Sequence, residues 1–82
     1  MIIRAAVKVN GNIYTGRRHV YAIHAAVKAG QPTPITQQMQ GFITNDGIFL
    51  DRVNARIHAV QNKQIEFDET RVGKPLISEE LW

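Results

Sequence analysis

The stretch from residue 41 to residue 57, GFITNDGIFLDRVNARI, constrains the fold of this chain more than any other part of it. Its pattern predicts a strand, a tight turn at Asn45-Asp46-Gly47, a second short strand and then a helix. Asp51 stands just before the helix, where a carboxylate can accept hydrogen bonds from the free N–H groups of the first turn. The apolar side chains expected to anchor that helix are Val53, Ile57 and Val60.

The N-terminal residues carry the signal of a β-hairpin. Apolar and polar residues alternate over residues 2–9, Asn10-Gly11 interrupts the alternation, and residues 12–15 follow as a second short run. Asn and Gly both tolerate the positive φ of a type I′ turn, so a two-residue loop is expected. Such a loop sets two cross-strand pairs: Val9 with Asn12, and Val7 with Tyr14.

An earlier helix is expected to open at Thr15-Gly16, to run to about Ala29 and to stop at Gly30. The apolar side chains that recur along it are expected to form its buried stripe: Val20, Ile23 and Val27. The helix after Asp51 is expected to fade near Asn62.

The remaining segments are shorter. Residues 31–34 contain two prolines and therefore form a loop, and residues 35–40 allow one helical turn. Residues 64–67 are expected to extend as a strand. Ser78 resembles a helix start, and the terminal Leu81-Trp82 pair should pack on this chain or on a partner.

Together these elements predict an α+β fold: a small antiparallel β-sheet with two α-helices packed on it and an N-terminal β-hairpin, in a single domain over residues 1–82. A chain of this length buries only about 60% of its unfolded surface, so its stability is expected to be thin and oligomerisation is a common remedy. It has no cysteine, which excludes disulfides and thiol chemistry. No apolar run is long enough to span a membrane or to form a signal-peptide core, so we expect a soluble, unprocessed protein.

Charge divides the chain into two parts. Residues 1–65, the basic body, carry eight Lys or Arg against two Asp, whereas residues 66–82, the acidic tail, carry five Asp or Glu against two Lys or Arg. This distribution predicts an anion-attracting surface on the body and a tail that docks on its own body or on a neighbour.

The first candidate site is Gly16-Arg17-Arg18-His19, at the start of the earlier helix. A helix N-terminus carries partial positive charge, so two arginines there are unfavourable by about 0.3 to 1 kcal/mol each unless an anion is bound. A phosphate or carboxylate would therefore explain them. The alternative is that both arginines point into solvent or pair with the acidic tail.

Arg52 and Arg56 form the second candidate site, because a spacing of four residues places them on one face of the later helix. Like charges at this spacing repel each other, and a shared anion would relieve that repulsion. The alternative is again solvation, or a bridge to a carboxylate of the tail.

Phe42 and Phe49 lie on the two arms of the predicted turn, and an aromatic ring beside phosphate-binding arginines can stack on a purine. We expect Phe49 to be buried in the core, which leaves Phe42 as the stacking candidate.

The residues give no metal site and no cofactor. His19 and His24 are five residues apart, which sends them to different sides of a helix, and no carboxylate or third histidine has a suitable spacing. An enzyme would depend on His19 with Arg17 or Arg18 for phosphodiester chemistry, and we do not expect one.

The chain also contains an ordered set of short motifs: IIRAA at 2–6, YTGRRH at 14–19, GFITNDGIFLDR at 41–52, QI at 64–65 and SEELW at 78–82. In this order they resemble a family of small phage proteins, the first type of Thoeris anti-defence sponges. The resemblance covers nearly the whole chain.

The resemblance implies a phage protein of the host bacterial cytoplasm that sequesters a cyclic nucleotide-type immune signal without cleaving it. In that family the signal is glycocyclic ADP-ribose, or cyclic di- or trinucleotides in some members, and the proteins are homo-oligomers, dimers that assemble into rings. Matching positions imply the following roles: phosphate contacts for Gly16, Arg17 or Arg18, and His19, stacking on adenine for Phe42, and a phosphate clamp for Arg52.

A rival function from a different class is a phage inhibitor that docks directly on a bacterial defence complex, as an anti-CRISPR protein does. Binding of nucleic acid by the same basic surface is a third possibility, which we do not favour.

Overall fold

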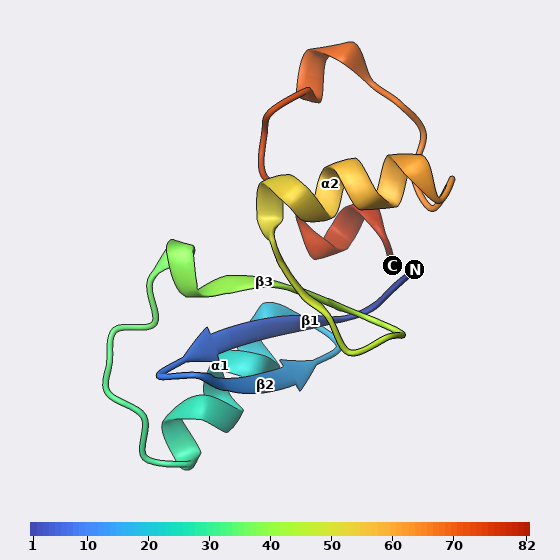
Figure 1. Ribbon diagram of the computed structural model, residues 1–82. Helices are drawn as coiled ribbons and strands as arrows, with labels where there is room; N and C mark the ends of the chain where they lie inside the picture. Colours follow the sequence, from blue (N-terminus) through green and yellow to red (C-terminus); the bar gives the residue numbers. More distant parts are fainter.

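The computed structural model describes residues 1–82 and shows a four-stranded antiparallel sheet with two α-helices (Figure 1). The strands are β1 (Ile2–Val9), β2 (Asn12–Gly16), β3 (Gln40–Thr44) and β4 (Phe49–Asp51), and they lie in the order β2-β1-β3-β4. The helices are α1 (His19–Lys28) and α2 (Arg52–Gln61), with three short 3₁₀ helices, η1 (Gln37–Met39), η2 (Glu69–Arg71) and η3 (Ser78–Glu80). The predicted α+β fold with an N-terminal hairpin is confirmed. None of the helices is long and apolar enough to cross a membrane.

The hairpin forms as its sequence predicts. Asn10 and Gly11 adopt positive φ angles of 51° and 79°, which supply the turn. The two predicted pairs are present: Val9 with Asn12 and Val7 with Tyr14.

One face of the sheet carries the core. Ala5 of β1 lies opposite Phe42 of β3, and Phe42 lies opposite Leu50 of β4, so the three side chains share a face. The register shifts between Ile2 and Arg4, and this irregularity lets Ile2 join the same cluster as Ala5.

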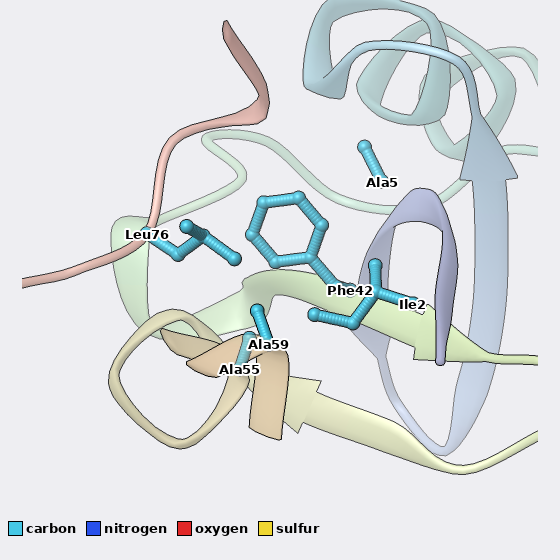
Figure 2. Close-up of a cluster of buried hydrophobic side chains, with 6 residues drawn as sticks. All are labelled: Ile2, Ala5, Phe42, Ala55, Ala59 and Leu76. Atoms are coloured by element: carbon cyan, nitrogen blue, oxygen red, sulfur yellow. The ribbon is translucent and has the colours of Figure 1, made fainter. Parts of the chain in front are cut away.

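Two apolar clusters fill the space between the sheet and the helices. The first, drawn in Figure 2, consists of Ile2, Ala5, Phe42, Ala55, Ala59 and Leu76. The ring of Phe42 projects from β3 into the space between Leu76 and the two alanines of α2 (Figure 2). The second consists of Val7, Val9, Ala22 and Ala26, and it lies under α1. Phe42 is therefore a core residue, and the prediction that it is exposed while Phe49 is buried is wrong, since Phe49 is partly exposed.

Both helices face the sheet with their alanines and not with the predicted apolar stripes. The buried residues of α1 are His19, Ala22 and Ala26, and those of α2 are Ala55, Arg56 and Ala59. The large apolar side chains that point outward instead are Val20, Val27, Val53 and Ile57. Alanines allow a helix to approach the sheet closely, and close packing is favoured by the density of protein interiors. The predictions of buried stripes in both helices are therefore wrong for these residues.

The connecting segments match the predictions with one exception. Residues 37–39 form the single helical turn expected after the prolines, and Leu81 and Trp82 pack on the first cluster. Residues 64–67 form no strand. The side chain of Gln64 accepts a hydrogen bond from the Ile2 N–H (2.9 Å) and donates one to the Ile2 carbonyl (2.7 Å), so an amide side chain takes the place of backbone pairing there.

Candidate anion-binding pocket

An open pocket of about 590 Å³ lies where the N-termini of α1 and α2 meet the C-terminal tail. Arg18 and His19 reach it from the start of α1, Arg52 from the start of α2, and Ser78 and Glu79 from the tail. Its volume is in the range of small-molecule sites in proteins, about 300–1,000 Å³. Three of the seven predicted site residues therefore come together, although they belong to stretches far apart in the sequence.

Arg52 is the best-anchored of these groups. Its Nη1 donates to the Leu76 carbonyl (3.1 Å) and its Nη2 to Oε1 of Gln40 (2.7 Å), whereas its Nε is buried without a partner. Burial lowers the pKa of Arg52, an effect that nearby Glu79 partly opposes, but a guanidinium stays charged at neutral pH. The result is a cation that two hydrogen bonds hold in place.

Arg52 also borders a second open pocket, of about 740 Å³, on its other side. The two pockets share Gln37, Arg52 and Pro75. Arg52 therefore lines both pockets.

Arg18 is held more loosely. It occupies the N-cap position of α1, where no side chain accepts a hydrogen bond from the first N–H groups, which have no partner within a helix. The Arg18 Nη1 donates to the Ser78 hydroxyl (3.3 Å) and lies 3.8 Å from a carboxylate oxygen of Glu79, whose side chain is 68% exposed. An exposed ion pair at such a distance contributes only about 0–1 kcal/mol to stability, so moving Glu79 away from Arg18 costs little free energy.

His19 lines the pocket but has a structural task as well. Its Nε2 lies 2.6 Å from the Gly41 carbonyl, and its ring makes an edge-to-face contact with Phe42 at 4.8 Å between centroids. Burial is the main cause that lowers the pKa of His19, and the charge of Arg52 lowers it further, although the Gly41 hydrogen bond opposes the shift. The imidazole is therefore neutral at pH 7 and can act as a polar contact, not as a cation.

The other predicted site residues lie elsewhere. Phe42 is fully buried and so cannot stack on a base without unfolding. Gly16 is buried against α1, where an added Cβ would lie 2.8 Å from the Cβ of Tyr21, which explains the glycine by packing. Arg17 is exposed and lines a separate small pocket with Trp82. The burial of Phe42 contradicts its expected role in stacking, whereas the expected phosphate contacts of Gly16 and Arg17 stay predictions.

Arg56 is occupied by the tail. Its Nη1 and Nη2 donate to the two carboxylate oxygens of Glu80 (3.0 and 2.6 Å), and its remaining donors reach the carbonyls of Lys74 and Pro75. Of the two alternatives that the sequence left open for the arginines, the bridge to the tail is the one observed for Arg56, and Arg18 also contacts the tail.

Sequence reasoning missed the contribution of the tail to the pocket wall. Ser78, Glu79 and Pro75 line the pocket together with Gln37. The acidic composition of residues 66–82 indicated docking on the body, but it did not indicate which arginine each carboxylate would meet.

Comparison with known proteins gives one match. A family model described as "Phage T4 y16D protein" matches residues 1–82, the whole chain. Neither the comparison with curated proteins nor the comparison with solved structures found a match.

Proposed function

The chain belongs to the phage T4 y16D protein family, and from this premise we propose that it acts inside the infected host cell by sequestering a phosphate-bearing, nucleotide-type signal without cleaving it. A cyclic nucleotide-type signal such as glycocyclic ADP-ribose, or a cyclic oligonucleotide, is the proposed ligand. The observation that carries the proposal is the convergence of Arg18 and Arg52 on one pocket at two helix N-termini.

The chemistry of the pocket supports an anionic ligand. Guanidinium groups bind phosphates through paired N–H donors, and a helix N-terminus adds free N–H groups and partial positive charge. Nη1 and Nη2 of Arg52 each make one hydrogen bond within the protein, so each keeps a second N–H for a ligand.

Glu79 supports the same proposal as a weak internal competitor. Its carboxylate stands 3.8 Å from Arg18 while remaining mostly exposed. A phosphate brings more negative charge and more acceptor oxygens than one carboxylate, so it displaces Glu79 at small cost.

The test uses Arg18→Ala and a matched control, Arg17→Ala, which changes the same residue type at the adjacent, exposed position outside the pocket. Purified protein is incubated with cyclic mono-, di- and trinucleotides and glycocyclic ADP-ribose, washed and denatured by heat, and the released compound is identified by mass spectrometry. We expect wild type and Arg17→Ala to release the ligand intact. Arg18→Ala should bind it about tenfold or more weakly, since a hydrogen bond to a charged group contributes about 1.5–3 kcal/mol.

Three outcomes would contradict the proposal. The first is a wild type that retains no nucleotide. The second is release of the compound in degraded form, which would indicate an enzyme. The third is an equal loss of binding in the two arginine variants, which would place the site elsewhere.

A second candidate function is an inhibitor that docks on a bacterial defence complex, and one observation favours it. The outward faces of α1 and α2 expose large apolar side chains, among them Val20 and Ile57. Apolar faces of this kind mark protein interaction sites. This candidate predicts a protein that retains no nucleotide and forms a stable complex with a host protein.

A further inference from the structure

The outer face of α2 and the loop that follows this helix enclose an apolar groove. The groove has a volume of about 180 Å³, and the loop arches over α2 in Figure 1. Its apolar lining consists of Val53, Ile57, Val60, Phe67 and Val72. Ile57 is 51% exposed and Phe67 is 68% exposed, so much of this lining is in contact with water. A cavity of about 150 Å³ holds one benzene molecule, so the groove has room for one large apolar side chain.

Four charged groups beside the groove neutralise one another. Arg56 and Asp68 line the groove itself. Arg56 makes a bidentate ion pair with Glu80, at 3.0 and 2.6 Å, and Glu80 also accepts a hydrogen bond from Nη1 of Arg71 at 2.8 Å. The Nε of Arg71 lies 3.7 Å from a carboxylate oxygen of Asp68. These two arginines and two carboxylates therefore form one network without net charge.

Two further carboxylates leave a surplus of negative charge at this place. Glu66 lines the groove, and an open depression of about 750 Å³, which shares four of its lining residues with the groove, also includes Glu69. Both side chains are exposed, and neither has an ion pair within the chain. The groove and the depression together carry four carboxylates against two guanidinium groups.

The sign of this surplus decides which kind of partner fits. Nucleic acids and anionic lipid headgroups carry negative phosphates, which the unpaired carboxylates repel. A cationic side chain is attracted to them instead, and an apolar side chain beside it gains free energy by leaving water for the groove. The groove and the depression share no residue with the anion-binding pocket, so the two sites attract opposite charges at separate places.

We propose that the groove beside α2 binds a segment of another protein in which one large apolar residue is flanked by lysine or arginine. The apolar side chain packs against Ile57 and Phe67, and the flanking cations pair with Glu66 and Glu69. A segment suits this surface better than a small molecule, because the groove opens into the larger depression, where the neighbouring residues of the segment find acceptors. This interaction does not depend on the ligand proposed for the anion-binding pocket.

The probe is a synthetic peptide, Gly-Lys-Lys-Phe-Lys-Lys-Gly with blocked ends, added to ¹⁵N-labelled protein. The shifts of the backbone amides in NMR spectra give both the dissociation constant and the place of binding. Two matched peptides carry Ala in place of Phe, or Glu in place of every Lys. We expect saturable binding of the first peptide, binding about tenfold or more weaker for the Ala peptide because it buries no large apolar side chain, and no binding of the Glu peptide.

Two variants of the protein and two matched controls locate the contact. Phe67→Ala removes an exposed wall of the groove, and Ile48→Ala shortens an exposed apolar side chain in the turn between β3 and β4. Glu66→Gln removes an unpaired carboxylate, and Asp46→Asn removes an exposed carboxylate of that distant turn. We expect Phe67→Ala to weaken peptide binding about tenfold and Glu66→Gln about two- to fivefold, whereas the controls bind like wild type. All four should keep the circular dichroism of wild type, and Phe67→Ala should retain nucleotide as wild type does, so the two proposals are tested separately.

Other results would overturn the proposal. Wild type that binds none of the peptides would leave the groove without this occupant. Equal binding of the Phe and Ala peptides would mean that only charge attracts them and that the groove takes no side chain. Amide shifts outside residues 53–73, or equal losses in a groove variant and its control, would place the peptide elsewhere on the protein.

Discussion

The ion pair between Arg56 and Glu80 is the shorter and more buried of the two ion pairs that join the tail to the body. It is bidentate and largely shielded, with side-chain exposures of 9% and 18%. Removing one partner of a buried pair leaves the other charge unpaired, which costs about 3–5 kcal/mol when burial is complete. Glu80 is therefore expected to contribute much more to stability than its neighbour Glu79.

We expect Glu80→Gln to lower the free energy of unfolding by about 3 kcal/mol, the low end of that range because the pair is not fully buried. Urea denaturation followed by circular dichroism measures the change. Glu79→Gln is the control, since Glu79 is mostly exposed and its loss should cost at most about 1 kcal/mol. Equal effects of the two substitutions would show that the Arg56 pair does not hold the tail.

His19 predicts a pH dependence of stability. Its pKa in the folded protein is lowered, mainly by burial, so the unfolded chain binds a proton at a higher pH than the folded one. The contribution of His19 to stability is therefore fully present above about pH 6.5, the ordinary pKa of histidine, and is lost as the pH falls below that value.

The measurement is the free energy of unfolding between pH 7.5 and pH 5.5, in wild type and in His19→Gln. Wild type should lose stability over this window and the variant should lose less. Two carboxylates also have lowered pKa values: Glu80, chiefly because of its hydrogen bond to Arg56, and Asp68, chiefly because of its hydrogen bond from Thr70. Their contribution to stability is lost only at lower pH, as the pH falls below the ordinary pKa range of carboxyl groups. Equal slopes in wild type and variant would exclude His19 as the source.

At the scale of elements, the hairpin was predictable and the helix orientations were not. The Asn10-Gly11 turn fixes its register through local backbone geometry, and no distant residue is needed. Each helix, by contrast, carries two stripes with helical periodicity, one of large residues and one of alanines. Periodicity alone favours the more apolar stripe, but the alanines face the sheet: those of α2 pack in the cluster that contains Phe42, and those of α1 pack against Val7 and Val9.

Because the alanines are buried and the valines are exposed, we expect substitutions of the alanines to lower the stability more than substitutions of the valines. Ala26→Leu adds volume to a fully buried position and should lower the free energy of unfolding by about 1–3 kcal/mol. Val27→Ala removes an exposed side chain and should change it by no more than about 0.5 kcal/mol. Urea denaturation followed by circular dichroism compares the two. A greater loss from Val27→Ala would mean that α1 packs by its large residues after all.

At the scale of the whole molecule, the sequence indicated some residues of the candidate site but not that they lie close together in the fold. Local helix starts marked Arg18 and Arg52 as unusual cations, because each stands where the helix dipole disfavours it. Their convergence depends on the tail, whose Leu76 enters the first cluster and whose carbonyl holds Arg52. Phe42 was misassigned for the same reason, since the side chain that covers it comes from the tail and leaves no local signal.

The position of Trp82 makes it a fluorescent probe of the tail. It is the only tryptophan, and its indole Nε1 donates to the Arg17 carbonyl at 2.6 Å while its ring packs on the first cluster. Arg17 directly precedes Arg18 in the chain, so the indole is bonded to the backbone next to the proposed ligand site. We therefore expect its fluorescence to change when the tail undocks, in the unlabelled protein.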